Sequence, residues 1–201
     1  MSGGRFRLAR VELPIETPRL ILRLPCYRDV GDLRRSFRKR LTARAVGAPL
    51  HSAEEMHDPR LMIARTRREY QGAEHLSLSV ERRDSGAVVG RVGLRGLDWT
   101  WRKVESLSYW IDPGWWNQGI ATEASWYLCD AAFRKLGMRR VASQALAPNG
   151  ASRAVLGKLG FVEEGRERQS IQVRGRCMDM ILYGLLKGEL TPRPSISGDR
   201  S

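Results

Sequence analysis

Residues 109–123 read Tyr-Trp-Ile-Asp-Pro-Gly-Trp-Trp-Asn-Gln-Gly-Ile-Ala-Thr-Glu. The apolar start predicts the end of a β-strand, and Asp-Pro-Gly is typical of a turn. A helix is predicted next, over residues 120–136, because apolar residues recur at helical spacing and a glycine follows. The N–H groups in the first turn of a helix lack backbone partners and lie at the positive end of its dipole. A diphosphate can bind there if the side chains are small, as they are at Gly119 and Ala121. A glycine at such a junction can also serve the turn alone.

The sequence around this stretch predicts a mixed α/β chain, or more narrowly an α+β chain. We expect helices at 29–40, 53–70 and 149–159, and strands at 19–24, 76–81, 88–97, 104–111, 140–146, 161–168 and 177–186. Pro59 lies inside the second helix, which therefore breaks there or starts late. Residues 1–15 are expected to form a lead-in, 16–188 a single domain, and 189–201, rich in Pro, Ser and Gly, a disordered tail.

The composition of the 201-residue chain is that of an ordinary soluble domain, with 42% hydrophobic and 28% charged residues. No apolar run reaches the roughly 18 residues that a membrane-spanning helix needs, and the first residues lack the pattern of a signal peptide. Three cysteines far apart favour a reducing, cytoplasmic setting, and the three histidines show no metal-site spacing with them. The net charge of +13 fits an acidic partner, or only an Arg-rich soluble surface.

Several segments together resemble a known family. The segment Trp-Asn-Gln-Gly-Ile-Ala-Thr-Glu-Ala at 116–124 resembles the acetyl-CoA pyrophosphate loop of the GNAT superfamily of N-acetyltransferases, and in particular its RimJ/RimL-type branch. Segments similar to the branch's first strand, fourth strand, Asn-x-x-Ser…Leu-Gly-Phe block and last strand occur in the same order, at 16–23, 108–112, 149–161 and 179–183. Asn117 stands where the superfamily usually has Gly, and Asn tolerates left-handed backbone angles.

The resemblance implies a mostly antiparallel sheet of six to seven strands, splayed between the fourth and fifth, with about four flanking helices. It implies that acetyl-CoA lies in the splay and that no metal is needed. The residues implied to contact acetyl-CoA are Trp110, Ile111, Asp112, Gln118, Gly119, Ile120, Ala121, Thr122, Asn149 and Ser152. The reaction implied is direct transfer of acetyl to a primary amine, most simply the N-terminal α-amine of a ribosomal protein.

The transfer requires an acid for the leaving thiolate and a base for the amine. Ser152 is the candidate acid, although it could equally belong to the helix cap at Asn149. The carboxylates that the branch often carries on its fourth and sixth strands correspond here to Ser106 and Ile171. Glu105 is adjacent, but strand alternation turns it to the opposite face. Glu105 or a water molecule is therefore the candidate base.

Two alternatives to protein acetylation stay open at this point. Arg34, Arg35, Arg38, Lys39 and Arg40 would give the first helix a basic face, which suits a ribosome, another acidic partner, or an RNA-binding module with a vestigial cofactor site. Related enzymes also acetylate small amines or antibiotics, and the loops at 41–60 and 97–103 would select the acceptor. The resemblance is compatible with a monomer or a homodimer.

Overall fold

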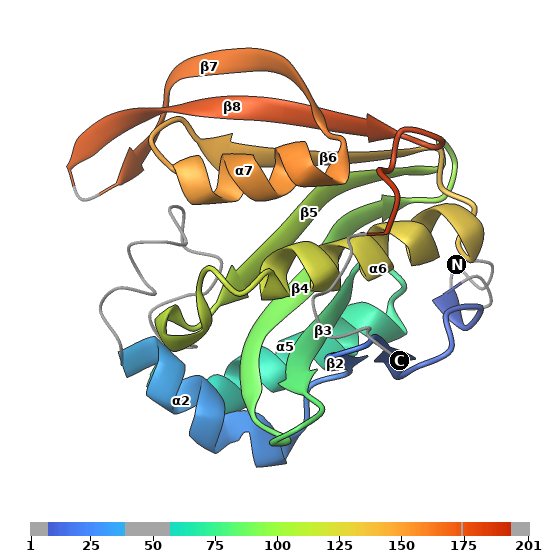
Figure 1. Cartoon of the computed structure of the whole chain (residues 1–201), viewed down its shortest axis with the longest axis vertical. Coiled ribbons are helices and arrows are strands. Elements are labelled where there is room, and N and C mark those ends of the chain that lie inside the picture. The colour runs from blue at the N-terminus through green and yellow to red at the C-terminus, as the bar shows by residue number, and fades with distance from the viewer. Residues whose placement is uncertain (1–7, 39–56, 174, 194–201) are drawn as a thin grey trace.

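The computed structural model describes residues 8–38, 57–173 and 175–193. In this part of the chain eight strands form one sheet in the order β1-β2-β3-β4-β5-β6-β8-β7, and all neighbours are antiparallel except β5 and β6 (Figure 1). The strands are β1 (Ile15–Glu16), β2 (Leu20–Arg23), β3 (Leu76–Arg82), β4 (Val88–Asp98), β5 (Lys103–Ile111), β6 (Arg140–Leu146), β7 (Val162–Val173) and β8 (Arg176–Leu186). The mostly antiparallel α+β architecture is confirmed, and the two-residue β1 brings the strand count above the expected six to seven.

The sheet opens between β5 and β6. The last paired residues of these two strands are Leu107 and Ser143, but β5 runs on to Ile111 and β6 to Leu146. Beyond this point β5 stays paired with β4, and β6 stays paired with β8. The two strands diverge in Figure 1, with β5 following β4 and β6 following β8. The expected splay is therefore present, and it leaves a free edge on β5.

Among the described residues, two helices pack on each face of the sheet. Helices α6 (Ile120–Arg134) and α7 (Gly150–Leu159) cover the face on which the main hydrophobic core lies. Helices α2 (Val30–Arg38) and α5 (Pro59–Gln71) pack on the opposite face around a smaller core that includes Trp110. Leucine and valine alternate with serine and glutamate along β3, so the α6 face is apolar and the α5 face is polar.

Some boundaries differ from those expected. Helix α5 starts late, with Asp58 as its N-cap and Pro59 in its first turn, where proline is favourable. The first residues expected for this helix, 53–56, and the end of the basic helix beyond Arg38 lie outside the described residues. The lead-in is packed from Leu8 onward, since Leu8 and Val11 are buried in the main core.

Residues 189–193, which were expected to belong to the tail, contact the domain. The Thr191 N–H donates to the carbonyl of Leu159, and the Trp126 indole donates to the carbonyl of Thr191. Residues 189–193 are therefore bound to α6 and α7, and residues 194–201 lie outside the described part.

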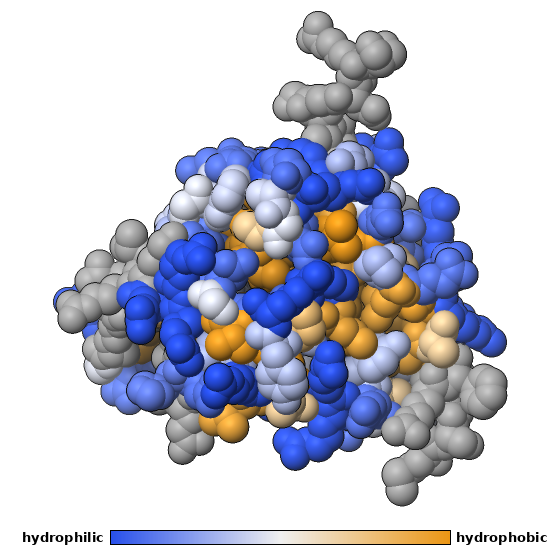
Figure 2. Space-filling model, turned by 90° about the horizontal axis from the view of Figure 1, so that it is seen from below, coloured by the Kyte–Doolittle hydropathy of each residue, from blue (hydrophilic) through white to orange (hydrophobic). Residues whose placement is uncertain are grey.

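On the face seen from below, hydrophobic residues reach the surface between hydrophilic ones over the middle of the view (Figure 2). No helix among the described residues has the length and apolar character required to span a membrane.

Candidate active site

The N-terminus of α6 has the geometry expected of an anion site. Gly119 is the N-cap residue in a left-handed conformation (φ 74°), and no side-chain hydrogen bond from the described residues caps this end of the helix. The first intrahelical bond runs from the Glu123 N–H to the Gly119 carbonyl, so the N–H groups of the first turn have no acceptor within the helix. Asn117 is also left-handed (φ 58°), which confirms that it fits the tight turn. Helix α7, by contrast, is capped by the side chain of Asn149.

A cluster around a buried carboxylate, formed with two residues from near the N-terminus, holds this turn. The Glu123 carboxylate is buried and accepts the Thr17 hydroxyl at 2.6 Å and the Arg19 Nε at 2.7 Å. The same arginine donates through Nη1 to the carbonyl of Gln118, at 2.9 Å. Arg19 therefore joins the turn before α6 to the first turn of α6 itself. We call Thr17, Arg19 and Glu123 the Glu123 cluster.

At the free edge of β5, only every second residue directs its backbone N–H and C=O groups into the splay. The Asp112 N–H donates to the Val89 carbonyl at 2.8 Å, which makes Asp112 a hydrogen-bonded partner of β4. In an antiparallel pair the bonding direction alternates, so Trp110 also bonds to β4, whereas Tyr109 and Ile111 direct their N–H and C=O groups into the splay. The Ile111 carbonyl accepts the Trp116 indole N–H at 2.7 Å.

The side chains of Trp110 and Asp112 are turned towards α2. The Trp110 ring lies 5.4 Å from that of Phe37, centroid to centroid. The Asp112 carboxylate accepts the Ser36 hydroxyl at 2.6 Å and the Gly114 N–H at 2.8 Å. These contacts fix the end of β5 against α2 and shape the turn that leads to α6.

The opposite side of the splay is formed by α7. Asn149 accepts the N–H of Ser152 at 3.1 Å, so both expected residues lie in the first turn of this helix. The Tyr109 hydroxyl lies 3.0 Å from the Ser152 Oγ and also 3.0 Å from the Ser152 carbonyl. Burial raises the pKa of Tyr109 well above its ordinary value, so the phenol stays protonated. A pair of hydroxyl groups thus spans the splay from β5 to α7.

The candidate bases lie apart from this pair. Glu105 is exposed, and its carboxylate lies over Gly96, where an added Cβ would stand only 2.3 Å from it. Ser106 pairs with Arg95 on β4, and Ile171 lies on β7 opposite Met178. The described residues include no group of three or more His, Cys, Asp or Glu that could hold a metal.

Comparison with known proteins identifies the family. The profile of the acetyltransferase (GNAT) domain matches residues 19–162. The chain belongs to the GNAT family. Its relatives include YoaA of Bacillus subtilis, named as an uncharacterised N-acetyltransferase, which is 30% identical over 173 residues, 86% of this chain and 96% of that protein. YdaF of the same organism, whose name assigns it provisionally to ribosomal N-acetyltransferases, is 40% identical over 104 residues. That match covers 52% of this chain and 56% of YdaF.

A solved structure with the same fold is that of Mycobacterium smegmatis RimJ in complex with CoA-disulfide. It has a TM-score of 0.78 and 22% identity, and the match covers 90% of this chain and 91% of that one. The names of the relatives agree with the RimJ/RimL-type branch, and this GNAT protein is an N-acetyltransferase.

Three residues at the site of this GNAT enzyme were not anticipated. Arg19 and Glu123 are 104 positions apart, and nothing in the local pattern of either residue indicates their contact. Tyr109 could have been found from strand alternation, because residues 108 and 110 face α5 and the residue between them must face α7.

Proposed function

We propose that this protein transfers the acetyl group of acetyl-CoA to the N-terminal α-amine of a protein. The observation that carries the proposal is the uncapped N-terminus of α6 beside the free edge of β5. The first offers N–H groups to a diphosphate, and the second offers N–H and C=O groups to an amide-containing arm. Acetyl-CoA carries both features in one molecule, ending in a thioester.

Each part of the site has a distinct task in this proposal. The diphosphate lies against the amides of Gln118, Gly119, Ile120, Ala121 and Thr122. The arm pairs with the β5 edge through Ile111 and Tyr109, while Trp110 and Asp112, also expected to bind it, support this edge from the α2 side. The side chain of Asn149 holds the first turn of α7, which brings Ser152 to the opposite side of the arm.

In this proposal, the leaving thiolate receives its proton from the pair of hydroxyl groups on Tyr109 and Ser152. Tyr109 stays protonated, and its single hydroxyl hydrogen can go to the Ser152 carbonyl or to the Ser152 Oγ. When it goes to Oγ, the Ser152 hydroxyl hydrogen is free to point at the sulfur. The amine is mostly ammonium at neutral pH and must lose a proton before it attacks. The exposed position of Glu105 favours water over this carboxylate as the acceptor of that proton.

The exposed basic face of α2 supports a macromolecular acceptor. Arg34, Arg35 and Arg38 are exposed, and Arg35 forms an ion pair at 3.2 Å with Asp32 of the same helix. A ribosome or another acidic assembly could dock on such a face. A dedicated RNA-binding module would need no hydroxyl pair across the splay, so this arrangement favours the enzyme.

The test combines binding with thiol release. Calorimetry with acetyl-CoA should give one site per chain, and thiol release should be faster with peptides than with polyamines or aminoglycosides. Mass spectrometry should locate the acetyl group on the α-amine, and the same peptide with a blocked N-terminus but a free lysine is the control. Binding without peptide acetylation would refute the acceptor, and absence of acetyl-CoA binding would refute the whole proposal.

A further inference from the structure

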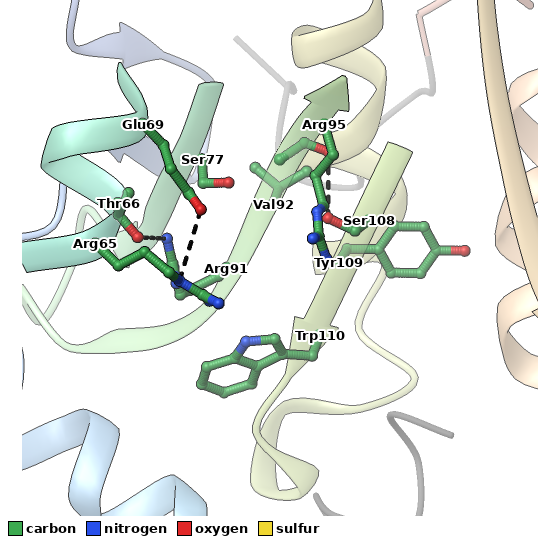
Figure 3. A pocket seen from close by; sticks show the side chains of 11 residues that line it. Arg65, Thr66, Glu69, Ser77, Arg91, Val92, Arg95, Ser108, Tyr109 and Trp110 are labelled. Atoms are coloured by element: carbon green, nitrogen blue, oxygen red, sulfur yellow. Dashed lines mark hydrogen bonds and ion pairs between the residues drawn. The ribbon is translucent and has the colours of Figure 1, made fainter. Parts of the chain in front are cut away.

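A shallow recess, partly open to solvent, lies between α5 and the polar face of β3, β4 and β5 (Figure 3). Small residues in direct register form its floor, since Ser77 pairs with Gly93 and Gly93 pairs with Ser108. An added Cβ at Gly93 would stand 2.6 Å from the Ser77 Oγ, so the glycine is needed to keep this row compact. We call this space the α5 recess.

The side chains around the floor are mainly cationic. Arg91 and Arg95 flank Gly93 on the same strand, two residues to either side, and Arg65 approaches from α5. Figure 3 shows the three guanidinium groups around the recess together with one carboxylate, that of Glu69. The lining therefore contains three positive charges and one negative charge.

The three arginines are held to different degrees. Arg91 is buried and donates to the Thr66 hydroxyl at 2.8 Å, and Arg65 lies 3.7 Å from the Glu69 carboxylate. Arg95 is exposed and forms no ion pair with any residue in the described ranges. Its guanidinium is thus available to an anion that enters the recess from solvent.

The α5 recess borders the place where acetyl transfer would occur. Its lining includes Ser108, Tyr109 and Trp110, which belong to β5 beyond its last pair with β6. Neighbouring strands lie about 4.8 Å apart, so β4, which carries Arg91 and Arg95, lies roughly 5 Å from this edge. An extended peptide covers that distance in one to three residues.

We propose that the α5 recess selects acceptor N-termini that carry aspartate or glutamate at the second or third residue. The inference rests on the proposed function, because it assumes that the α-amine lies at the β5 edge. The peptide's acidic side chain would then meet Arg95 at the mouth of the recess, with Arg91 and Arg65 deeper in it.

The test compares three peptides that differ only at residues two and three: Ser-Asp-Glu, Ser-Asn-Gln and Ser-Lys-Lys, each followed by the same sequence. The kcat/KM of the acidic peptide should exceed that of the amide peptide at least about 10-fold at low salt, and the lysine peptide should be the poorest. The advantage should shrink as salt rises, since exposed charges are screened.

Variants assign the preference to the recess. Arg95→Glu should lower the ratio of acidic to amide kcat/KM at least about 10-fold, and Arg95→Gln should lower it less. Arg139 is also exposed, but it precedes β6 at the paired end of the strand, so Arg139→Glu makes the same charge change away from the recess and should leave the ratio unaltered. Thermal unfolding checks that each variant is folded.

The outcomes separate the two proposals. Equal kcat/KM for the acidic and amide peptides, or a ratio that Arg95→Glu and Arg139→Glu lower equally, would overturn the selection by the α5 recess and leave N-terminal acetylation standing. If none of the three peptides is acetylated while acetyl-CoA binds, the protein-acceptor proposal fails, and the recess proposal fails with it.

Discussion

The two faces of the sheet differ in how the arginines near them are held. On the α6 side, Arg19 is fixed by the buried Glu123 carboxylate and by the Gln118 carbonyl, so the turn before the helix has a defined shape. On the α5 side, Arg95 is exposed and unpaired within the described part of the chain. A turn of fixed shape suits acetyl-CoA, the donor, which is the same in every reaction cycle. An exposed arginine suits the acceptor, because the peptide side chain that it would bind differs from one acceptor to another.

This difference leads to opposite expectations for the two regions. Changes at α6 and the Glu123 cluster should alter the affinity for acetyl-CoA whatever the acceptor is. Changes in the α5 recess should alter the choice of acceptor and leave the affinity for acetyl-CoA as it was. A variant of either region that affected both quantities equally would break the comparison.

The largest effect is expected for Gly119→Val. A β-branched residue at a φ of 74° costs about 1–3 kcal/mol of strain, and its side chain would stand beside the N–H groups of the first turn. Acetyl-CoA affinity measured by calorimetry should fall about 100-fold or more. Gly86 is the matched control, since it has a φ of 67° in open space at the β3–β4 turn. Gly86→Val should carry similar strain with unaltered affinity.

The next effect is expected for Arg19→Met. Glu123 would keep the Thr17 hydroxyl but lose its charged partner, and leaving a buried carboxylate underpaired costs about 1–3 kcal/mol. The Gln118 carbonyl would lose its donor, so we expect acetyl-CoA affinity to fall about 10-fold, with a lower Tm. Arg140 is about as exposed and pairs with Glu164 on the surface. If Arg140→Met weakened acetyl-CoA binding as much, the Glu123 cluster would have no special effect on the turn.

The sequence predicts the structural features that depend on residues close together along the chain. The turn at 112–119, the start of α6, the cap at Asn149 and the alternation in β3 follow from local residue types. The contact between Arg19 and Glu123 could not be predicted, because it depends on β2 lying beside α6, a product of the whole sheet order. The row of Ser77, Gly93 and Ser108 likewise requires the register of three strands. The contacts of Thr191 with Leu159 and Trp126 could not be predicted either, because these residues are distant from it in sequence.

A smaller effect, on rate alone, is expected for Tyr109→Phe. The hydroxyl beside Ser152 would be lost, so kcat should fall about 10-fold while acetyl-CoA affinity stays within about twofold. Burial raises the pKa of Tyr109, so the phenol is protonated both at pH 7 and at pH 9.5. The ratio of wild-type to variant kcat should therefore be constant over this range. Tyr183→Phe removes a hydroxyl that contacts Arg153 instead, and it should leave kcat near that of the wild type.

The smallest effect is expected for Glu105→Gln. The carboxylate is exposed beside Gly96, and it does not line the α5 recess that borders the β5 edge, where the amine would lie. If water accepts the proton of the ammonium group, the pH–rate profile of the variant should superimpose on that of the wild type, with kcat/KM within about twofold. If instead the profile lost its acidic limb, Glu105 would be the base. A residue outside both the Glu123 cluster and the α5 recess would then take part in the chemistry, and the comparison of these two regions would no longer account for the whole site.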